Sequence, residues 1–101
     1  MDLDASFDGR TVRAAPGDVL VVRLAENRTA GYRWRVEEAG APVCRLVEDA
    51  YDAGGPGLGA AGSRRQAFEV VQPGAARIVL AYGRSWQPAP ARRFTVGVDA
   101  S

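Results

Sequence analysis

The chain contains no histidine and no lysine, and it has a single cysteine, Cys44. Without histidine it cannot build a Ser-His-Asp triad, a Cys-His dyad or any other histidine-based acid–base pair. One cysteine and no histidine exclude an ordinary zinc site, which takes several such ligands, and also exclude an internal disulfide. We therefore expect no cofactor and no metal, and we expect Cys44 to be a buried or half-buried strand residue.

The chain also lacks a charge imbalance and a long apolar run. Its 13 arginines balance 12 acidic residues that are spread along the sequence, so the net charge is only +1. This pattern predicts neither a nucleic-acid partner nor a membrane surface. No apolar run reaches the length of about 18 residues that a membrane-spanning helix needs. The start, Met1 to Asp4, has neither a basic nor an apolar region and predicts no signal peptide, which leaves the location open.

What remains is a composition typical of a small β protein. A chain of 101 residues has room for one domain, which we expect to span residues 1–101. Valine, leucine, isoleucine and phenylalanine together make up about 22% of the residues, just above the level below which disorder is expected. The excess of valine over leucine favours strands rather than helices.

Short runs with a period of two alternate with turn residues along the whole chain. Because alternation places one face of a strand in a core and the other in water, each run predicts a half-buried strand. The predicted strands are 18–24, 32–37, 43–48, 66–71, 75–82 and 92–99, with weaker candidates at 3–7 and 11–14. Their spacing is typical of a sandwich or barrel. Trp34 lies on the inward face of its strand, so we expect it to be a core residue.

The connections between these strands alternate between tight turns and longer loops. The longer ones are residues 26–31, 49–64 and 83–91. If each strand reverses the chain direction, these three loops lie together at one end of the sandwich. A rigid framework that presents adjacent loops is typical of a binding surface.

Each longer loop contains residues suited to contact with another molecule. Residues 54–62 are rich in glycine and admit a close approach to the backbone, with Leu58 as a lone aliphatic side chain. Leu58 either inserts into a partner or folds back onto the sandwich. Trp86 is either an exposed interface residue or a lid over the sandwich end. Arg84 either contacts a partner or hydrogen-bonds loop carbonyls.

The loop sequences resemble a known family. The first loop reads Asn27-Arg28-Thr29-Ala30-Gly31-Tyr32-Arg33-Trp34, which resembles the Asn-Pro-Thr-Thr-Gly-Tyr/Phe-x-Trp signature of the chagasin-type inhibitors of papain-like cysteine proteases. The second motif of that family is similar to Gly59-Ala60-Ala61-Gly62-Ser63 followed by Phe68, and the third, Arg-Pro-Trp, is similar to Tyr82-Gly83-Arg84-Ser85-Trp86. The three motifs occur in the order and spacing of that family, and the resemblance covers the chain from about residue 11 onward.

The resemblance implies both a fold and a function. The fold is all-β, an immunoglobulin-like antiparallel β-sandwich of about seven strands. The function is reversible, tight-binding inhibition of a papain-like cysteine protease, whose active-site cleft is occluded by loops 26–31, 54–64 and 83–88. Such a protein is not an enzyme, and we expect it to act as a monomer.

The resemblance also assigns roles to residues of the loops. Thr29 would lie deepest, over the catalytic Cys–His pair, with Leu58 near the main specificity pocket on the unprimed side and Trp86 on the primed side. The implied protease-binding residues are Asn27, Arg28, Thr29, Ala30, Gly31, Leu58, Gly59, Ala60, Ala61, Gly62, Arg84, Ser85 and Trp86.

Three positions depart from the family pattern. Arg28 and Ser85 replace prolines, and Ala30 replaces a second threonine. Because proline rigidifies a loop, its loss raises the cost of ordering the loop on binding.

An alternative function is a β-sandwich module that binds carbohydrate through Tyr82 and Trp86, or binds another protein. A structural or adhesion domain is a further alternative.

Overall fold

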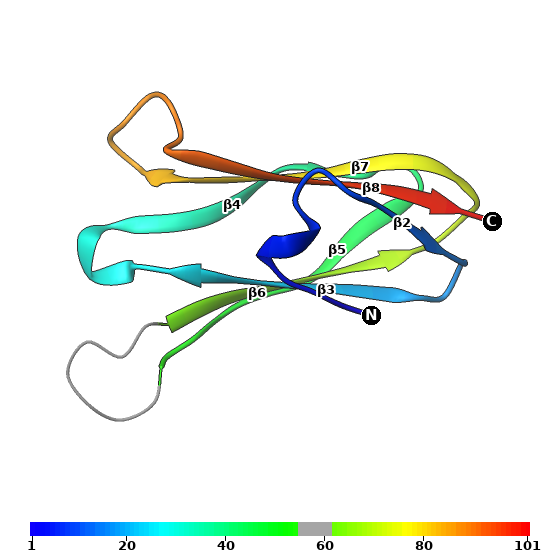
Figure 1. The fold of residues 1–101 in the computed structure, drawn as a ribbon, viewed down its shortest axis with the longest axis horizontal. Helices are drawn as coiled ribbons and strands as arrows, with labels where there is room; N and C mark the ends of the chain where they lie inside the picture. Colours follow the sequence, from blue (N-terminus) through cyan, green and yellow to red (C-terminus); the bar gives the residue numbers. More distant parts are fainter. Residues whose placement is uncertain (55–61) are drawn as a thin grey trace.

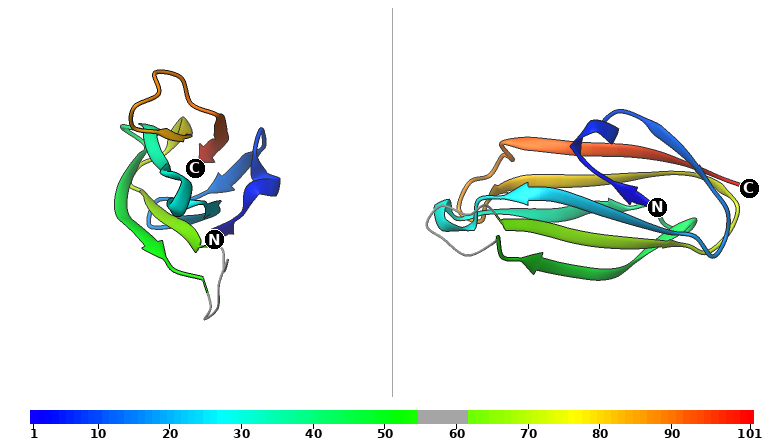
Figure 2. Two further views of the ribbon diagram at one scale, coloured as in Figure 1. Left: turned by 90° about the vertical axis from the view of Figure 1, so that its left-hand side faces the viewer. Right: turned by 60° about the horizontal axis from the view of Figure 1, so that its bottom comes forward.

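A computed structural model describes residues 1–54 and 62–101. Eight strands form two four-stranded sheets that pack face to face, so the predicted all-β sandwich is confirmed (Figures 1 and 2). In order across the first sheet, the strands are β1 (Asp2–Leu3), β3 (Val19–Glu26), β6 (Gly62–Val70) and β5 (Cys44–Asp52). The second sheet contains β2 (Thr11–Ala14), β8 (Arg92–Ala100), β7 (Gly74–Arg84) and β4 (Tyr32–Ala39). No helix of the described residues is long and apolar enough to cross a membrane.

The two weak N-terminal strands make the sheets mixed rather than purely antiparallel. β1 pairs with β3 and β2 pairs with β8, both in parallel, while every other pair is antiparallel. The sandwich is antiparallel, as predicted, except at these two edges. The N-terminal segment contributes β1 to the first sheet and β2 to the second. Neither β1 and β3 nor β2 and β8 are therefore joined as a hairpin. The run expected at 3–7 is also shorter, because Ala5–Phe7 forms a 3₁₀ turn, η1.

The core follows the predicted alternation. In β3, Leu20, Val22 and Leu24 are buried, while the residues between them are more accessible. Trp34 is also buried, as expected for the inward face of β4. Cys44 is buried and reduced, and burial raises the pKa of its thiol. The largest fully buried apolar side chains are Phe68, Phe94, Leu3, Leu20, Ile78 and Leu80.

β5 and β6 extend into the segment 49–64, which the sequence analysis assigned to a loop. β5 continues to Asp52 and β6 begins at Gly62. Ion pairs across the two strands accompany this extension: the Arg65 guanidinium lies 2.6 Å from both Glu48 and Asp52. The glycine-rich part of this segment predicts a loop. The edge strand β5 is largely solvated and shows no alternation of buried and exposed residues that would have indicated a strand.

The longer connections meet at one end of the sandwich (Figure 1). Residues 27–31 and 85–91 lie there, together with the end of β5 and the start of β6. We call this end the loop end. The turns 15–18, 40–43 and 71–73 lie at the opposite end. The predicted grouping of the loops is thus confirmed for the described connections.

Replacement of Trp34 by alanine is expected to destabilise the fold strongly. The side chain is 4% exposed, and its indole N–H donates to the Ala25 carbonyl oxygen at 2.9 Å. Loss of a buried tryptophan costs roughly 3–5 kcal/mol. Urea unfolding measures this change, and a Trp34→Ala protein with an unaltered free energy of unfolding would show that the core is assigned wrongly.

Candidate binding surface at the loop end

The β3–β4 loop is a compact single turn. Arg28–Ala30 form a 3₁₀ helix, η2, which ends at Gly31 with φ of 83°. Because this left-handed conformation disfavours side chains, glycine suits the position. The Gly31 N–H donates to the Arg28 carbonyl at 3.0 Å, and the Thr29 hydroxyl donates to the Asn27 side-chain oxygen at 2.8 Å. The loop therefore carries its own internal bonds while Asn27, Arg28 and Thr29 remain exposed.

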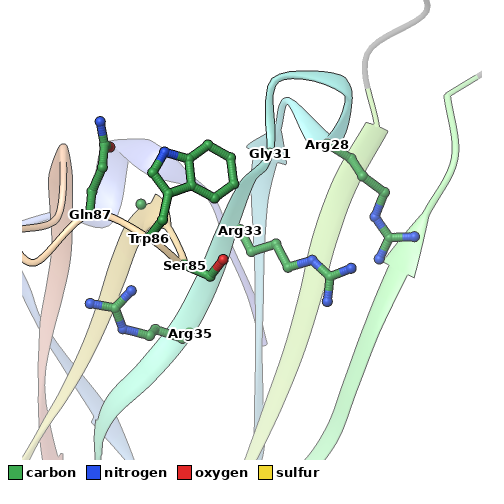
Figure 3. A pocket seen from close by; sticks show the side chains of 8 residues that line it. Arg28, Gly31, Arg33, Arg35, Ser85, Trp86 and Gln87 are labelled. Atoms are coloured by element: carbon green, nitrogen blue, oxygen red, sulfur yellow. The ribbon is translucent and has the colours of Figure 1, made fainter.

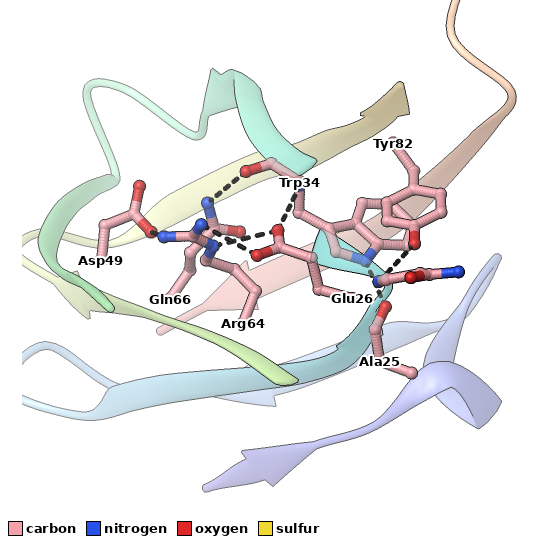
Figure 4. A network of polar contacts seen from close by, with 8 residues as sticks. Ala25, Glu26, Trp34, Asp49, Arg64, Gln66 and Tyr82 are labelled. Carbon is pink, nitrogen blue, oxygen red and sulfur yellow. Dashed lines mark hydrogen bonds and ion pairs between the residues drawn. The ribbon is translucent and has the colours of Figure 1, made fainter. Parts of the chain in front are cut away.

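A buried carboxylate lies beneath this loop. Glu26 is 1% exposed, and one of its oxygens accepts the backbone N–H of Trp34 at 2.7 Å. The Arg64 guanidinium donates to both Glu26 oxygens, at 3.1 and 2.9 Å (Figure 4). These hydrogen bonds are the main reason that the pKa of Arg64 is raised. A single side chain on β3 thus joins both stems of the loop to β6.

Glu26 is predicted from the sequence to begin a polar break, and the structure corrects this. Glu26 is the last residue of β3 and continues the inward-facing series Leu20, Val22 and Leu24. Its partner Arg64 also contacts Asp49 of β5, at 3.2 Å. A glutamate in the period-two register of a strong strand was the sequence signal that could have revealed its burial.

Aromatic side chains support the loop from the second sheet. The Tyr82 hydroxyl accepts the backbone N–H of Asn27 at 2.7 Å. The Tyr82 ring stacks on Tyr32 with centroids 5.0 Å apart and lies 4.7 Å from the Trp34 ring. Since Tyr82 belongs to β7, this stack fixes the β3–β4 loop to the strand that leads into the β7–β8 loop.

Trp86, in the β7–β8 loop, contacts the β3–β4 loop and remains exposed. Its side chain is 67% exposed, which excludes the alternative of a lid over the sandwich. A Cβ added to Gly31 would lie 2.6 Å from the Trp86 ring, so the two loops touch at this point (Figure 3). The Arg84 guanidinium lies 4.5 Å from the Tyr32 ring centroid and 5.7 Å from that of Trp86. In the described part of the chain, Arg84 Nε has no hydrogen-bond partner.

Tyr51 of β5 links the β3–β4 loop to the base of the glycine-rich segment. The Arg28 guanidinium lies 3.9 Å from the Tyr51 ring centroid. Gly62 is buried beside the same ring, and a Cβ there would overlap the Tyr51 hydroxyl. Tyr51 was not among the predicted site residues, because its contacts with Arg28 and Gly62 depend on the pairing of β5 with β6, which the sequence does not reveal.

The structure therefore brings together most of the predicted site residues. Those at the loop end are Asn27, Arg28, Thr29, Ala30, Gly31, Gly62, Arg84, Ser85 and Trp86. The remaining four, Leu58, Gly59, Ala60 and Ala61, lie outside the described residues. Within residues 1–54 and 62–101, no group of three or more cysteine, aspartate or glutamate side chains is arranged to hold a metal ion.

Comparison with known proteins identifies the family. Residues 13–98 match the sequence profile described as Chagasin family peptidase inhibitor I42. The chain belongs to the chagasin family of peptidase inhibitors. It is 33% identical over 101 residues to Amoebiasin-1 of Entamoeba histolytica, and the alignment covers 98% of each sequence. The function class predicted from the loop motifs, a protein inhibitor rather than an enzyme, is the class of this family.

Solved structures of other proteins share the fold. The solution structure of Amebosin superposes with a TM-score of 0.83 at 30% identity, covering 100% of this chain and 97% of that one. EhICP2, a cysteine protease inhibitor from Entamoeba histolytica, has a TM-score of 0.88 at 24% identity, covering 99% and 94%. PbICP-C, which was solved in complex with falcipain-2, has a TM-score of 0.69 at 16% identity, covering 99% and 98%.

Replacement of Glu26 by leucine is expected to destabilise the inhibitor by about 3–5 kcal/mol. Arg64 would keep only Asp49 as a partner in a largely buried site, and the Trp34 backbone N–H would lose its acceptor. The double variant Glu26→Leu/Arg64→Leu should recover part of this loss, since both charges are removed together. The matched control is Glu69→Leu, which breaks the more exposed pair with Arg45 and should cost about 1 kcal/mol or less. Equal losses for Glu26→Leu and Glu69→Leu in urea unfolding would contradict the buried network.

Replacement of Gly31 by alanine is expected to displace Trp86, because the new methyl group would overlap its ring. Gly17→Ala is the matched control: Gly17 also has a positive φ, 97°, but a Cβ there meets nothing within 4 Å. Both variants carry backbone strain, yet only Gly31→Ala should shift the Trp86 indole N–H signal in an NMR spectrum. An unshifted signal in Gly31→Ala would show that the two loops do not touch.

Proposed function

We propose that this chain is a reversible, tight-binding inhibitor of papain-like cysteine proteases and that its loop end occupies the active-site cleft. The observation that carries the proposal is the contact between Gly31 and Trp86, which joins the first and third motif loops into one projecting surface. Membership of the chagasin family supports it. PbICP-C, which has a similar fold, was solved in complex with falcipain-2, and this gives an example of a protein of this fold that binds a protease.

Inhibition on this proposal is by exclusion and needs no chemistry from the inhibitor. The loops would fill the cleft and bury about 1,600 Å² in total, as standard protein interfaces do. No peptide bond of the loops would be held in the geometry that nucleophilic attack requires, so the inhibitor would stay intact. Because the chain has no histidine, any pH dependence near neutrality should come mainly from the enzyme.

Each loop has a role in this proposal. Thr29 is the middle residue of the turn η2 and is exposed, and its small side chain would enter a narrow cleft next to the catalytic Cys–His pair. Trp86 presents most of its ring to solvent beside that turn and would pack on the primed side. The segment from Leu58 to Ala61 is proposed for the unprimed side on the family resemblance alone.

The structure also offers a physical substitute for the two missing prolines. Arg28 stands where the family motif has proline, and its guanidinium packs on Tyr51. Ser85 replaces the second proline, and the guanidinium of the neighbouring Arg84 lies 4.5 Å from the Tyr32 ring centroid and 5.7 Å from that of Trp86. Contacts with the framework thus hold the loops where covalent rigidity is absent, and they reduce the ordering cost on binding.

Replacement of Trp86 by alanine is expected to weaken inhibition of papain by about 30-fold, which corresponds to the roughly 2 kcal/mol of an interface hot spot. Thr29→Arg should weaken inhibition as well, because a long charged side chain does not fit a narrow cleft. Inhibition constants from a fluorogenic peptide assay measure both effects. Urea unfolding should show little loss of stability, since both side chains are exposed.

The matched control is Val71→Ala, which truncates another exposed hydrophobic residue, 43% exposed, at the opposite end. It should leave the inhibition constant unchanged. Unchanged constants in both Trp86→Ala and Thr29→Arg would reject the assigned surface. A wild-type protein that causes no stoichiometric loss of protease activity would instead favour the alternative of a carbohydrate- or protein-binding module.

A further inference from the structure

The charged residues are spread evenly along the sequence, but the fold gathers arginines without ion pairs at the loop end. Six arginines form ion pairs with carboxylates: Arg23, Arg45, Arg64, Arg65, Arg77 and Arg93. Among the described residues, five arginines at or near the loop end form none: Arg28, Arg33, Arg35, Arg84 and Arg92. Residues 55–61 contain no acidic side chain in the sequence, so they offer these arginines no carboxylate.

Carboxylates outside the ion pairs lie elsewhere. Asp18 belongs to a turn at the opposite end of the sandwich, and Asp99 lies near the C-terminus at that same end (Figure 1). The others, Asp2, Asp4 and Asp8, belong to the N-terminal segment. A chain with a net charge of only +1 therefore presents a positive loop end.

Three of these arginines, Arg28, Arg33 and Arg35, line an open hollow next to Trp86. Arg33 and Arg35 point outward from β4, since the alternating positions Trp34 and Val36 face the core. Their cross-strand neighbours on β7 are small, with Gly83 opposite Arg33 and Ala81 opposite Arg35, so nothing large covers them. The hollow measures about 670 Å³ (Figure 3). It is lined by Arg28, Gly31, Arg33, Arg35, Gly83, Ser85, Trp86 and Gln87.

The nearest acidic residue on the same strand is already engaged. Glu37 accepts a hydrogen bond from Arg93 at 2.6 Å, and this bond is the main cause of its lowered pKa. Arg35 adds a smaller favourable charge interaction with Glu37 but makes no ion pair with it. The Arg33 and Arg35 guanidinium groups thus remain available, and guanidinium groups bind carboxylates in a bidentate geometry.

We propose that the hollow formed by Arg33 and Arg35 binds acidic side chains of the target protease beside the primed half of its cleft, and that the positive loop end speeds association with such proteases. This inference rests on the proposed function. Continuity with Trp86 places the arginines at the margin of the proposed interface, where charges act mainly on the association rate. The arginines would make the inhibitor selective for papain-like proteases with an acidic rim.

The test compares two charge-matched double variants, Arg33→Gln/Arg35→Gln and Arg10→Gln/Arg13→Gln. Arg10 and Arg13 form no ion pair within the described chain and lie outside the loop end, so the control removes the same charge elsewhere. Stopped-flow association is measured from about 25 to about 300 mM NaCl. The enzymes are one papain-like protease with a negative potential beside its primed subsites and one with a neutral potential.

For the acidic protease, the wild-type association rate constant should fall as salt rises. Arg33→Gln/Arg35→Gln should lower it about tenfold at the lowest salt and flatten the salt dependence. The control variant should match the wild type, and the neutral protease should show little difference among the three proteins. Free hexaglutamate, but not hexalysine, should slow the wild-type association.

Equal rate constants for Arg33→Gln/Arg35→Gln and the wild type, or equal losses in both double variants, would overturn this inference while inhibition itself persists. A wild-type protein that inhibits neither protease would overturn the proposed function instead. Slowing by hexalysine as much as by hexaglutamate would also contradict a site for acidic groups.

Discussion

The buried carboxylate of Glu26 is the interaction on which the loop end depends. It accepts hydrogen bonds from the Trp34 backbone N–H and from two N–H groups of the Arg64 guanidinium. One side chain thus joins β3, β4 and β6 directly beneath the β3–β4 turn. A buried charge of this kind adds little net stability compared with an apolar core, but removal of one partner is costly. Its effect is geometric, because it permits a single position for both stems of the loop.

Above this network, the loops are held by contacts between them rather than by rigid residues within them. Arg28 reaches Tyr51 on one side, and Gly31 touches Trp86 on the other. Tyr82 binds the loop start from below. These contacts hold the loops to one another and to the framework in the free chain. Preorganisation of this kind favours tight binding without new contacts.

Much of this arrangement follows from local sequence patterns, and the rest depends on long-range pairing. Alternation in β3 and β4 predicted the strands and the burial of Trp34, and the order of loop lengths predicted their common end. The parallel pairing of β1 with β3 and of β2 with β8 was not predicted, because strands of two and four residues carry no sequence signal for the direction of pairing. Glu26 was missed because its polarity suggested a break, and the positive loop end because charge counts along a chain say nothing about which partners meet in space.

Amide hydrogen exchange can show whether the loop end enters the protease cleft. Exchange is measured by mass spectrometry for the free chain and for its complex with papain whose catalytic cysteine is replaced by alanine. The account predicts slower exchange in residues 27–33 and 84–88 and no change in the turns at 15–18 and 40–43. Slower exchange confined to those turns or to the outer faces of the sheets, with the loops unaffected, would contradict it.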